Sequence, residues 1–188
     1  MFLHKIALAA AFCLPFAAFA DELGDDGLHK PTWLRETFKD LREDLAEANA
    51  AGKRLAIVIE QLGCIYCTKM HKEVWPDPVI NKMLNKDFFF VQINMFGDVS
   101  VTDFDGEVLS ERAMVMKWGV MFTPTVLFLP EEVPKGLSAS RAAVGLVPGA
   151  LSKGMTLDML TWVRDRIYKS GENFQKYHAR MLNTRKSN

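Results

Sequence analysis

Cysteine is scarce in this sequence, with three residues among 188, and an excess of either charge is missing, because 23 basic residues balance 23 acidic ones. A chain without net charge has no long-range field to attract nucleic acid or an anionic membrane, so neither is an expected partner. Internal repeats and low-complexity segments are also missing, and 49% hydrophobic residues exclude a disordered chain. The length fits one globular domain with decorations.

Long apolar runs are equally rare, and the one that stands out begins the chain. A basic start precedes the apolar run Ile6–Phe19, and Ala18-Phe19-Ala20 stands directly before Asp21. The run contains Pro15 and is shorter than the about 20 residues that a membrane span needs. The pattern predicts a secretory signal peptide over residues 1–20, cleaved after Ala20 and leaving no membrane-inserted segment; an uncleaved anchor is the alternative.

Cleavage would remove Cys13 and leave Cys64 and Cys67 as the cysteines of the exported chain. Exported proteins meet an oxidising compartment, where structural disulfides usually close long loops, because long loops remove the most entropy from the unfolded chain. A pair separated by two residues closes almost no loop. Reactivity is therefore a better explanation for this Cys-Ile-Tyr-Cys pair than stability.

Hydrophobic periodicity predicts helices that alternate with strands. The predicted strands are Leu55–Ile59, Phe88–Asn94, Thr125–Leu129 and Arg141–Val147. The predicted helices are Leu34–Ala48, Ile65–Val74 with a continuation through Leu84 after the break at 75–78, Ser110–Trp118 and Thr156–Lys169. This alternation predicts an α/β fold, a sheet with parallel pairs and helices on both faces.

The composition also suggests boundaries. Residues 21–31 are acidic and contain glycine, which predicts a flexible lead before a domain over 32–170. The acidic stretch 96–108 looks like an insertion; it lacks the full ligand pattern of a calcium loop and is expected to be solvated. Residues 171–188 form a tail with apolar residues at helical spacing.

Cys64 stands at the predicted start of a helix and Cys67 one turn inside it. Unsatisfied backbone N–H groups and the positive end of the helix dipole stabilise a thiolate there, so the pKa of Cys64 should fall below the free value of about 8.5. Cys67 should be more buried and less acidic. This arrangement predicts that Cys64 is the nucleophile and Cys67 the thiol that resolves a mixed disulfide.

Other uses of a CxxC pair fit less well. Haem attachment needs a histidine where Thr68 stands, and structural zinc needs four ligands, for which no second ligand pair is present. Copper(I) remains an alternative, since Met70 and His71 could assist two thiolates. Helix packing for Met70 and a surface position for His71 are the more ordinary expectations.

The sequence resembles the thioredoxin superfamily over residues 32–170, because a buried strand leads to CxxC at a helix start and a Thr-Pro pair opens a later strand. More narrowly, it is similar to periplasmic SoxW-type thioredoxins, which are associated with bacterial sulfur oxidation. The segments that carry this similarity are Glu60–His71, Val101–Glu107, Lys117–Val120 and Phe122–Thr125. The resemblance implies a central mixed β-sheet flanked by helices, with an N-terminal helix, the acidic insertion and a helical tail as decorations.

The resemblance further implies a Cys64–Cys67 disulfide and a cis Pro124 across from Cys64, with Thr123 offering backbone hydrogen bonds to an extended substrate. The spacer residues Ile65 and Tyr66 replace the Gly-Pro of ordinary thioredoxins, so they should contact substrate differently.

Two further positions depart from the family pattern. Gly63 stands where ordinary thioredoxins have tryptophan, and Val58 stands where they bury an aspartate that assists proton transfer. Glu60 is the nearest acid. It could exchange protons with Cys67 if it is buried, and a solvated carboxylate at the strand end is the alternative.

These observations predict a periplasmic thiol:disulfide oxidoreductase without a cofactor that exchanges its dithiol with substrate proteins. No histidine lies between the cysteines, so the strong thiolate stabilisation of an oxidant is not expected and a reductant is favoured. The resemblance suggests a membrane electron donor of the DsbD or CcdA type and substrates linked to sulfur oxidation or cytochrome c maturation. A Cu(I) chaperone and a disulfide donor are the alternatives.

Overall fold

The computed structural model describes residues 23–187, so the expected signal peptide lies outside the described residues. Five strands form the central sheet in the order β1-β3-β2-β6-β7: β1 (Leu34–Arg35), β2 (Arg54–Glu60), β3 (Phe88–Asn94), β6 (Thr125–Phe128) and β7 (Gly145–Pro148). β3 runs parallel to β1 and β2, whereas β6 is antiparallel to both β2 and β7. The expected mixed sheet is confirmed.

The two central strands are the longest, and their sequences explain why. β2 and β3 pair in parallel from Arg54 opposite Phe88 to Glu60 opposite Asn94. Nearly every side chain of both strands is buried, as the continuous apolar runs predict for strands covered on both faces. Glu60 therefore ends a buried strand at the edge of the sheet where the next loop begins.

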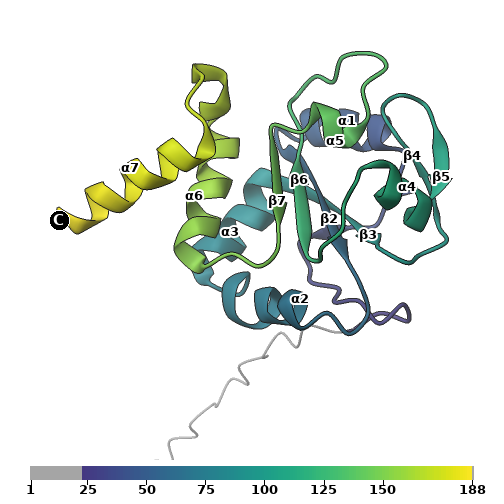
Figure 1. Ribbon diagram of the computed structural model, residues 1–188, viewed down its shortest axis with the longest axis horizontal. Coiled ribbons are helices and arrows are strands. Elements are labelled where there is room, and N and C mark those ends of the chain that lie inside the picture. The colour runs from purple at the N-terminus through teal and green to yellow at the C-terminus, as the bar shows by residue number, and fades with distance from the viewer. Residues whose placement is uncertain (1–22, 188) are drawn as a thin grey trace, which may run out of the picture.

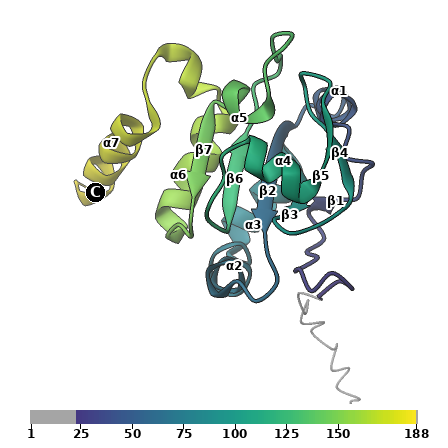
Figure 2. The ribbon, with the colours of Figure 1, turned by 45° about the vertical axis from the view of Figure 1, so that its right-hand side comes forward.

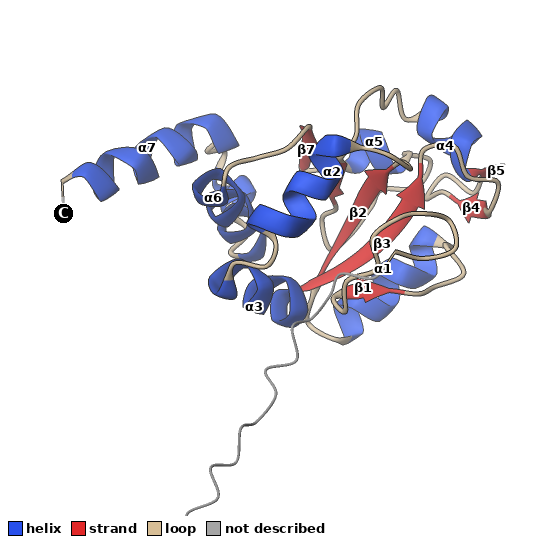
Figure 3. Ribbon diagram, turned by 90° about the horizontal axis from the view of Figure 1, so that it is seen from below, coloured by secondary structure: helices blue, strands red, loops and turns tan. Residues whose placement is uncertain are grey.

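Helices cover both faces of this sheet (Figures 1 and 3). They are α1 (Leu41–Ala50), α2 (Ile65–Lys69), α3 (Pro78–Asp87), α4 (Glu111–Lys117), α5 (Ala139–Ala142), α6 (Lys153–Arg164) and α7 (Phe174–Lys186). α2, α3 and α6 pack on one face around a core that includes Val58 and Phe90, and α1, α4 and α5 pack on the other around Ile57 and Val91. α2 continues as a π-helical turn, Met70–Val74.

The first helix begins later than the periodicity predicts. Leu34 belongs to β1, and Phe38 is 96% exposed, so neither lies on a buried helix face. The side chain of Asp40 accepts a hydrogen bond from the Arg42 N–H and caps α1, while Lys39 before it has a φ of 57°. The spacing of Leu34 and Phe38 imitates helical periodicity, and the capping residue fixes the actual start.

Two later predictions also need correction. The fourth strand is expected from Arg141, but Arg141 lies in α5 and β7 begins only at Gly145. The last domain helix is expected to reach Lys169, but α6 ends at Arg164. Arg166 then adopts a left-handed φ of 57° before a short 3-10 turn, and this conformation interrupts the helix.

The segment expected to be a flexible lead packs against the domain over its described part. Leu23 forms an isolated β-bridge with His29, and Leu28 is 2% exposed. Lys30 donates a hydrogen bond to the side chain of Gln92 on β3 at 2.7 Å. Composition predicts flexibility here, but these contacts anchor residues 27–31 beside the end of the sheet.

The acidic stretch also differs from the expected solvated loop. It forms a hairpin of β4 (Ser100–Thr102) and β5 (Val108–Ser110), at the opposite side of the molecule from α7 (Figure 2). The side chain of Asp103 is fully buried and accepts hydrogen bonds from the Trp118 indole and the Ala139 N–H. One of the acidic residues is thus an internal anchor of the domain.

The helical spacing in the tail corresponds to α7, which packs against α6. Tyr177 is 5% exposed, and Arg185 makes two hydrogen bonds to Asp158 of α6 at 2.7 and 2.8 Å. Within residues 23–187, no helix has both the length and the apolar character needed to cross a membrane.

A buried acid in α1 gives a first testable prediction. Burial raises the pKa of Asp44 to about 6, and the hydrogen bond that Thr37 donates to the carboxylate opposes this rise. The native protein therefore holds this proton more tightly than the unfolded chain, and stability falls as the pH rises through about 6. Asp44→Asn should raise the free energy of unfolding at pH 7 by about 1–3 kcal/mol, but change it little at pH 4. Urea denaturation at both pH values measures this change in the free energy of unfolding. The control is Glu47→Gln, at an exposed position of the same helix. An equal gain for Asp44→Asn at both pH values would contradict the assignment.

Candidate active site

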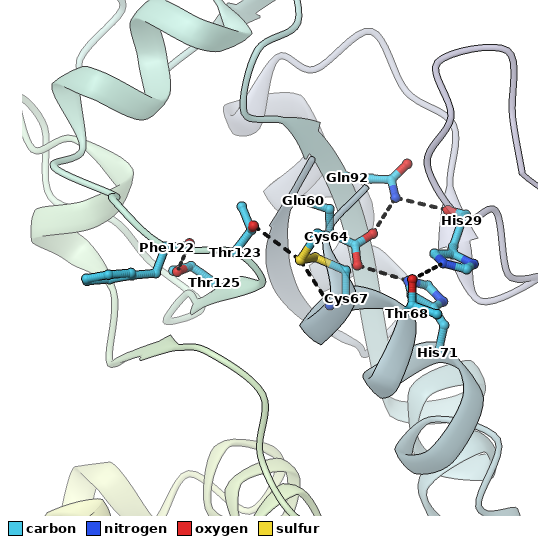
Figure 4. Close-up of a disulfide and its surroundings, with 10 residues drawn as sticks. All are labelled: His29, Glu60, Cys64, Cys67, Thr68, His71, Gln92, Phe122, Thr123 and Thr125. Carbon is cyan, nitrogen blue, oxygen red and sulfur yellow. Dashed lines mark hydrogen bonds and ion pairs between the residues drawn. A yellow bond between two sulfur atoms is a disulfide. The ribbon is translucent and has the colours of Figure 1, made fainter. Parts of the chain in front are cut away.

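Cys64 and Cys67 lie just beyond the end of β2, where the chain turns into α2 (Figure 4). They form a disulfide with a Cα–Cα distance of 5.2 Å. Cys64 is the N-cap of α2, and its Sγ accepts a hydrogen bond from the Cys67 N–H at 3.0 Å. After reduction, the same backbone N–H and the helix dipole favour a thiolate at Cys64.

The loop before β6 places Thr123 against this disulfide. Its hydroxyl donates a hydrogen bond to Cys64 Sγ at 3.3 Å, and the Thr123–Pro124 peptide bond is cis. Pro124 itself is buried. The hydroxyl of Thr125 donates to the Phe122 carbonyl at 2.7 Å, which holds the loop (Figure 4).

An open cleft of about 650 Å³ lies on this side of the disulfide. Cys64 and Thr123 line it, but Cys67 does not. Its rim carries exposed apolar side chains, Ile65 at 73%, Tyr66 at 57% and Phe122 at 62% exposure. The cleft therefore places Cys64 beside an exposed apolar surface.

Gly63 explains one departure from the ordinary thioredoxin sequence. Its φ is +72°, in the left-handed region that favours glycine, although a Cβ atom would meet nothing within 4 Å. Backbone conformation, not lack of space, therefore disfavours a bulky residue before Cys64.

Glu60 is buried behind the disulfide, with 1% exposure, so the solvated alternative is excluded. Its carboxylate accepts a hydrogen bond from Gln92 Nε2 at 2.6 Å and lies 3.0 Å from His71 Nε2. Val58, two residues earlier on the same face of β2, is fully buried in the core. Glu60 therefore lies two residues nearer the cysteines along β2 than the buried aspartate of ordinary thioredoxins.

His71 and Met70 occupy places that bear on the copper alternative. His71 is expected at the surface but is 3% exposed, because its ring lies among Trp33, Trp75 and His29 and its Nε2 faces Glu60. Met70 packs in the core, as expected. Among residues 23–187, no three His, Cys, Asp or Glu side chains are grouped as a metal site.

Sequence reasoning missed Gln92 and His29 as neighbours of the cysteines. Gln92 was a detectable signal, because it is the one polar residue within the otherwise apolar Phe88–Ile93. His29 gave none, since it lies in the segment interpreted as a lead. Its ring stacks on His71 with centroids 4.2 Å apart, and its Nε2 lies 3.4 Å from Thr68 Oγ1.

A second cavity, of about 290 Å³, lies on this other side of the disulfide. Both cysteines line it, together with Glu60, His29 and Lys72. Cys67 therefore faces a chamber separate from the cleft at Thr123, and Glu60 borders the same chamber.

Known proteins share this arrangement of strands and helices. The family model described as a thioredoxin-like domain matches residues 41–153. A thioredoxin-fold protein from Helicobacter pylori is similar in structure, with 18% identity and a TM-score of 0.53 over 71% of this chain and 86% of that one. A thioredoxin from Thermus thermophilus has 24% identity and a TM-score of 0.52 over 71% and 90%. Curated protein sequences give no match.

Proposed function

The chain belongs to the thioredoxin-like domain family and is a thiol:disulfide oxidoreductase, and we propose that it works in the periplasm as a reductant of protein disulfides. The observation that carries the proposal is the placement of the cysteine pair. Cys64 caps a helix and borders the open cleft with 8% of its surface exposed, whereas Cys67 is 2% exposed and borders the second cavity but not the cleft. The Cys64 thiol can react with a partner protein, and the Cys67 thiol lies behind it.

The reaction runs in two exchange steps. The Cys64 thiolate attacks one sulfur of the substrate disulfide, so that a Cys64–substrate bond forms and the other substrate sulfur leaves as a thiolate. Cys67 loses its proton and attacks Cys64 Sγ, which closes the Cys64–Cys67 disulfide and releases the second substrate sulfur. The substrate gains the two electrons that the protein loses. Of the two protons that the substrate sulfurs bind, Cys67 supplies one and water supplies the other, because Cys64 reacts as a thiolate.

The neighbouring residues have separate roles in this proposal. The Thr123 hydroxyl, already within 3.3 Å of Cys64 Sγ, stabilises negative charge on that sulfur. The backbone at Thr123 and Pro124 holds an extended substrate segment, and Ile65 and Tyr66 contact its apolar side chains. Glu60, which lines the second cavity together with Cys67, exchanges the proton of that thiol.

The sequence supports the proposed compartment, and the family resemblance supports the proposed electron source. The N-terminal residues read as a signal peptide, and a reductant in an oxidising compartment needs electrons delivered across the membrane. A thiol-transferring membrane protein of the DsbD or CcdA type fits that need. Proteins of sulfur oxidation or cytochrome c maturation are the proposed substrates.

The redox potential tests the proposed direction. Without a histidine in the spacer, equilibration with glutathione buffers should give a value of roughly −200 to −270 mV, near thioredoxin at about −270 mV. Alkylation and gel-shift measurement of the dithiol fraction gives the potential, and a Cys64→Ser, Cys67→Ser double variant is the blank. A value near about −120 mV would make the protein a disulfide donor.

A further inference from the structure

A network of polar side chains surrounds Glu60 behind the disulfide (Figure 4). The side chains of Glu60 and His71 are each 1% exposed, and His71 Nε2 lies 3.0 Å from Glu60 Oε1. The other carboxylate oxygen accepts a hydrogen bond from Gln92 at 2.6 Å. A buried carboxylate is costly without such partners, so this network stabilises Glu60 inside the fold.

The N-terminal segment 27–31, here named the strap, completes the network. The carbonyl oxygen of His29 accepts the second hydrogen bond from Gln92 Nε2 at 3.0 Å, and the His29 ring stacks on His71 with an interplanar angle of 17°. Lys30 Nζ donates to Gln92 Oε1 at 2.7 Å. Gln92 is therefore fixed in orientation by the strap, with its amide N–H groups directed at Glu60 and the His29 carbonyl.

Further charged and titratable groups surround Glu60 and Gln92, and Lys30 Nζ pairs with Asp26 at 2.7 Å as well as with Gln92. The Lys30 cation polarises Gln92 from one side, and His71 meets Glu60 from the other. The His29 ring stacks on the His71 ring. Lys72 and the cysteine pair border the chamber that Glu60 also lines.

We propose that His71 is a positioning residue that holds Glu60 as the proton acceptor of Cys67, and that the strap fixes Gln92 for the same purpose. The inference rests on the proposed function, because it concerns the second exchange step. It also explains how the site operates with Val58 in place of an acid. The carboxylate of Glu60 lies two residues after Val58 on the same face of β2. His71, one helical turn after Cys67, contacts it at this position.

Proton transfer and disulfide exchange are coupled in this step. The proton of Cys67 Sγ passes to a Glu60 carboxylate oxygen, and the resulting thiolate attacks Cys64 Sγ. The Cys64–Cys67 bond forms while the bond between Cys64 and the substrate sulfur breaks, and that sulfur leaves with the electron pair. Glu60 then gives this proton to water in the chamber, or through water to the leaving thiolate. The deprotonated carboxylate again pairs with His71.

The test measures the second step alone. The reduced protein is mixed with a disulfide-linked peptide, quenched with acid at successive times, and the mixed disulfide is followed by mass spectrometry. His71→Phe keeps an aromatic ring among Trp33, Trp75 and His29 but lacks the ring nitrogens. Because a positioned base contributes about 100-fold or more, loss of its positioning partner should slow resolution roughly tenfold.

The pH profile and the rescue separate positioning from packing. In His71→Phe the resolution rate should climb with pH over a wider range than in the wild type, because Cys67 must then ionise without Glu60. His71→Gln, whose amide can donate where Nε2 lies, should return the rate to within about threefold of the wild type. Lys30→Met, at a partly exposed position, should slow the step about two- to fivefold, and the exposed Lys82→Met should not.

The results decide between the two proposals. If His71→Phe, folded by near-UV circular dichroism, resolves the mixed disulfide at the wild-type rate with the wild-type pH profile, the positioning role is wrong. Slow resolution in His71→Phe without rescue by His71→Gln and with an unchanged pH profile would also overturn it, because packing alone would then explain the loss. If the wild-type protein forms no mixed disulfide at all, the proposed function fails instead.

Discussion

Replacing Cys67 with serine should turn the protein into a covalent trap for its partners. The variant keeps Cys64 as the N-cap of α2 and on the open cleft, so the first exchange still occurs. It lacks the sulfur that attacks Cys64 Sγ, and the mixed disulfide should accumulate. Non-reducing electrophoresis of the soluble and membrane fractions of the expressing cells, followed by mass spectrometry, should show complexes that exceed the wild-type level at least about tenfold.

The matched variant is Cys64→Ser, which leaves Cys67 at 2% exposure and away from the open cleft. It should trap far fewer proteins, and limited alkylation of the reduced wild type should modify Cys64 before Cys67. A membrane electron donor among the trapped species, together with oxidised substrates, supports the reductase direction. Newly exported reduced proteins would indicate a disulfide donor, and equal trapping by both variants would reverse the assignment of the two thiols.

Replacing Asp103 with alanine should destabilise the fold more than any other single change at the acidic hairpin. Asp103 is fully buried, accepts from the Trp118 indole at 2.9 Å and from the Ala139 N–H at 2.8 Å, and pairs with Lys117 at 2.9 Å. The alanine variant leaves these donors without their acceptor. Loss of one partner from such a buried network costs about 3–5 kcal/mol in free energy of unfolding.

Urea denaturation measures this loss, and the neighbouring Asp105 provides the control. Asp105 also pairs with Lys117, at 2.6 Å, but it lies at the rim, so Asp105→Ala should cost under about 1 kcal/mol. Asp103→Asn, which keeps one acceptor oxygen, should fall between the two. Equal losses for both alanine variants would mean that the hairpin is held by surface charge and not by the buried carboxylate.

Some parts of this molecule follow from local sequence. The strand Phe88–Asn94 has the predicted bounds, and α4 lies within the predicted helix Ser110–Trp118 with Ser110 as its cap. Continuous apolar runs and capping residues act within a few neighbours along the chain, so the sequence displays them directly. The short CxxC spacing is equally local, and it indicates a reactive pair by itself.

Other features depend on residues distant in sequence. Phe38 matches a helical repeat, but Asp40 caps the helix and leaves the ring exposed. Asp103 reads as one more surface acid, and only the approach of Trp118 and Ala139 makes it a buried acceptor. The composition of a segment predicts only how well its residues are solvated on average. The burial of a single carboxylate depends on which hydrogen-bond donors the fold brings to it.

The active site likewise combines features that the local sequence shows with features that only the tertiary structure decides. The sequence determined Cys64, Cys67 and Glu60 as candidates, because their spacing along one strand and one helix is local information. The tertiary structure decided that Glu60 is buried, that His71 turns inward and that the strap reaches Gln92. Gln92 lies 32 positions from Glu60 and 62 from Lys30, and the free energy of a buried charge depends on such distant neighbours and not on its own place in the chain.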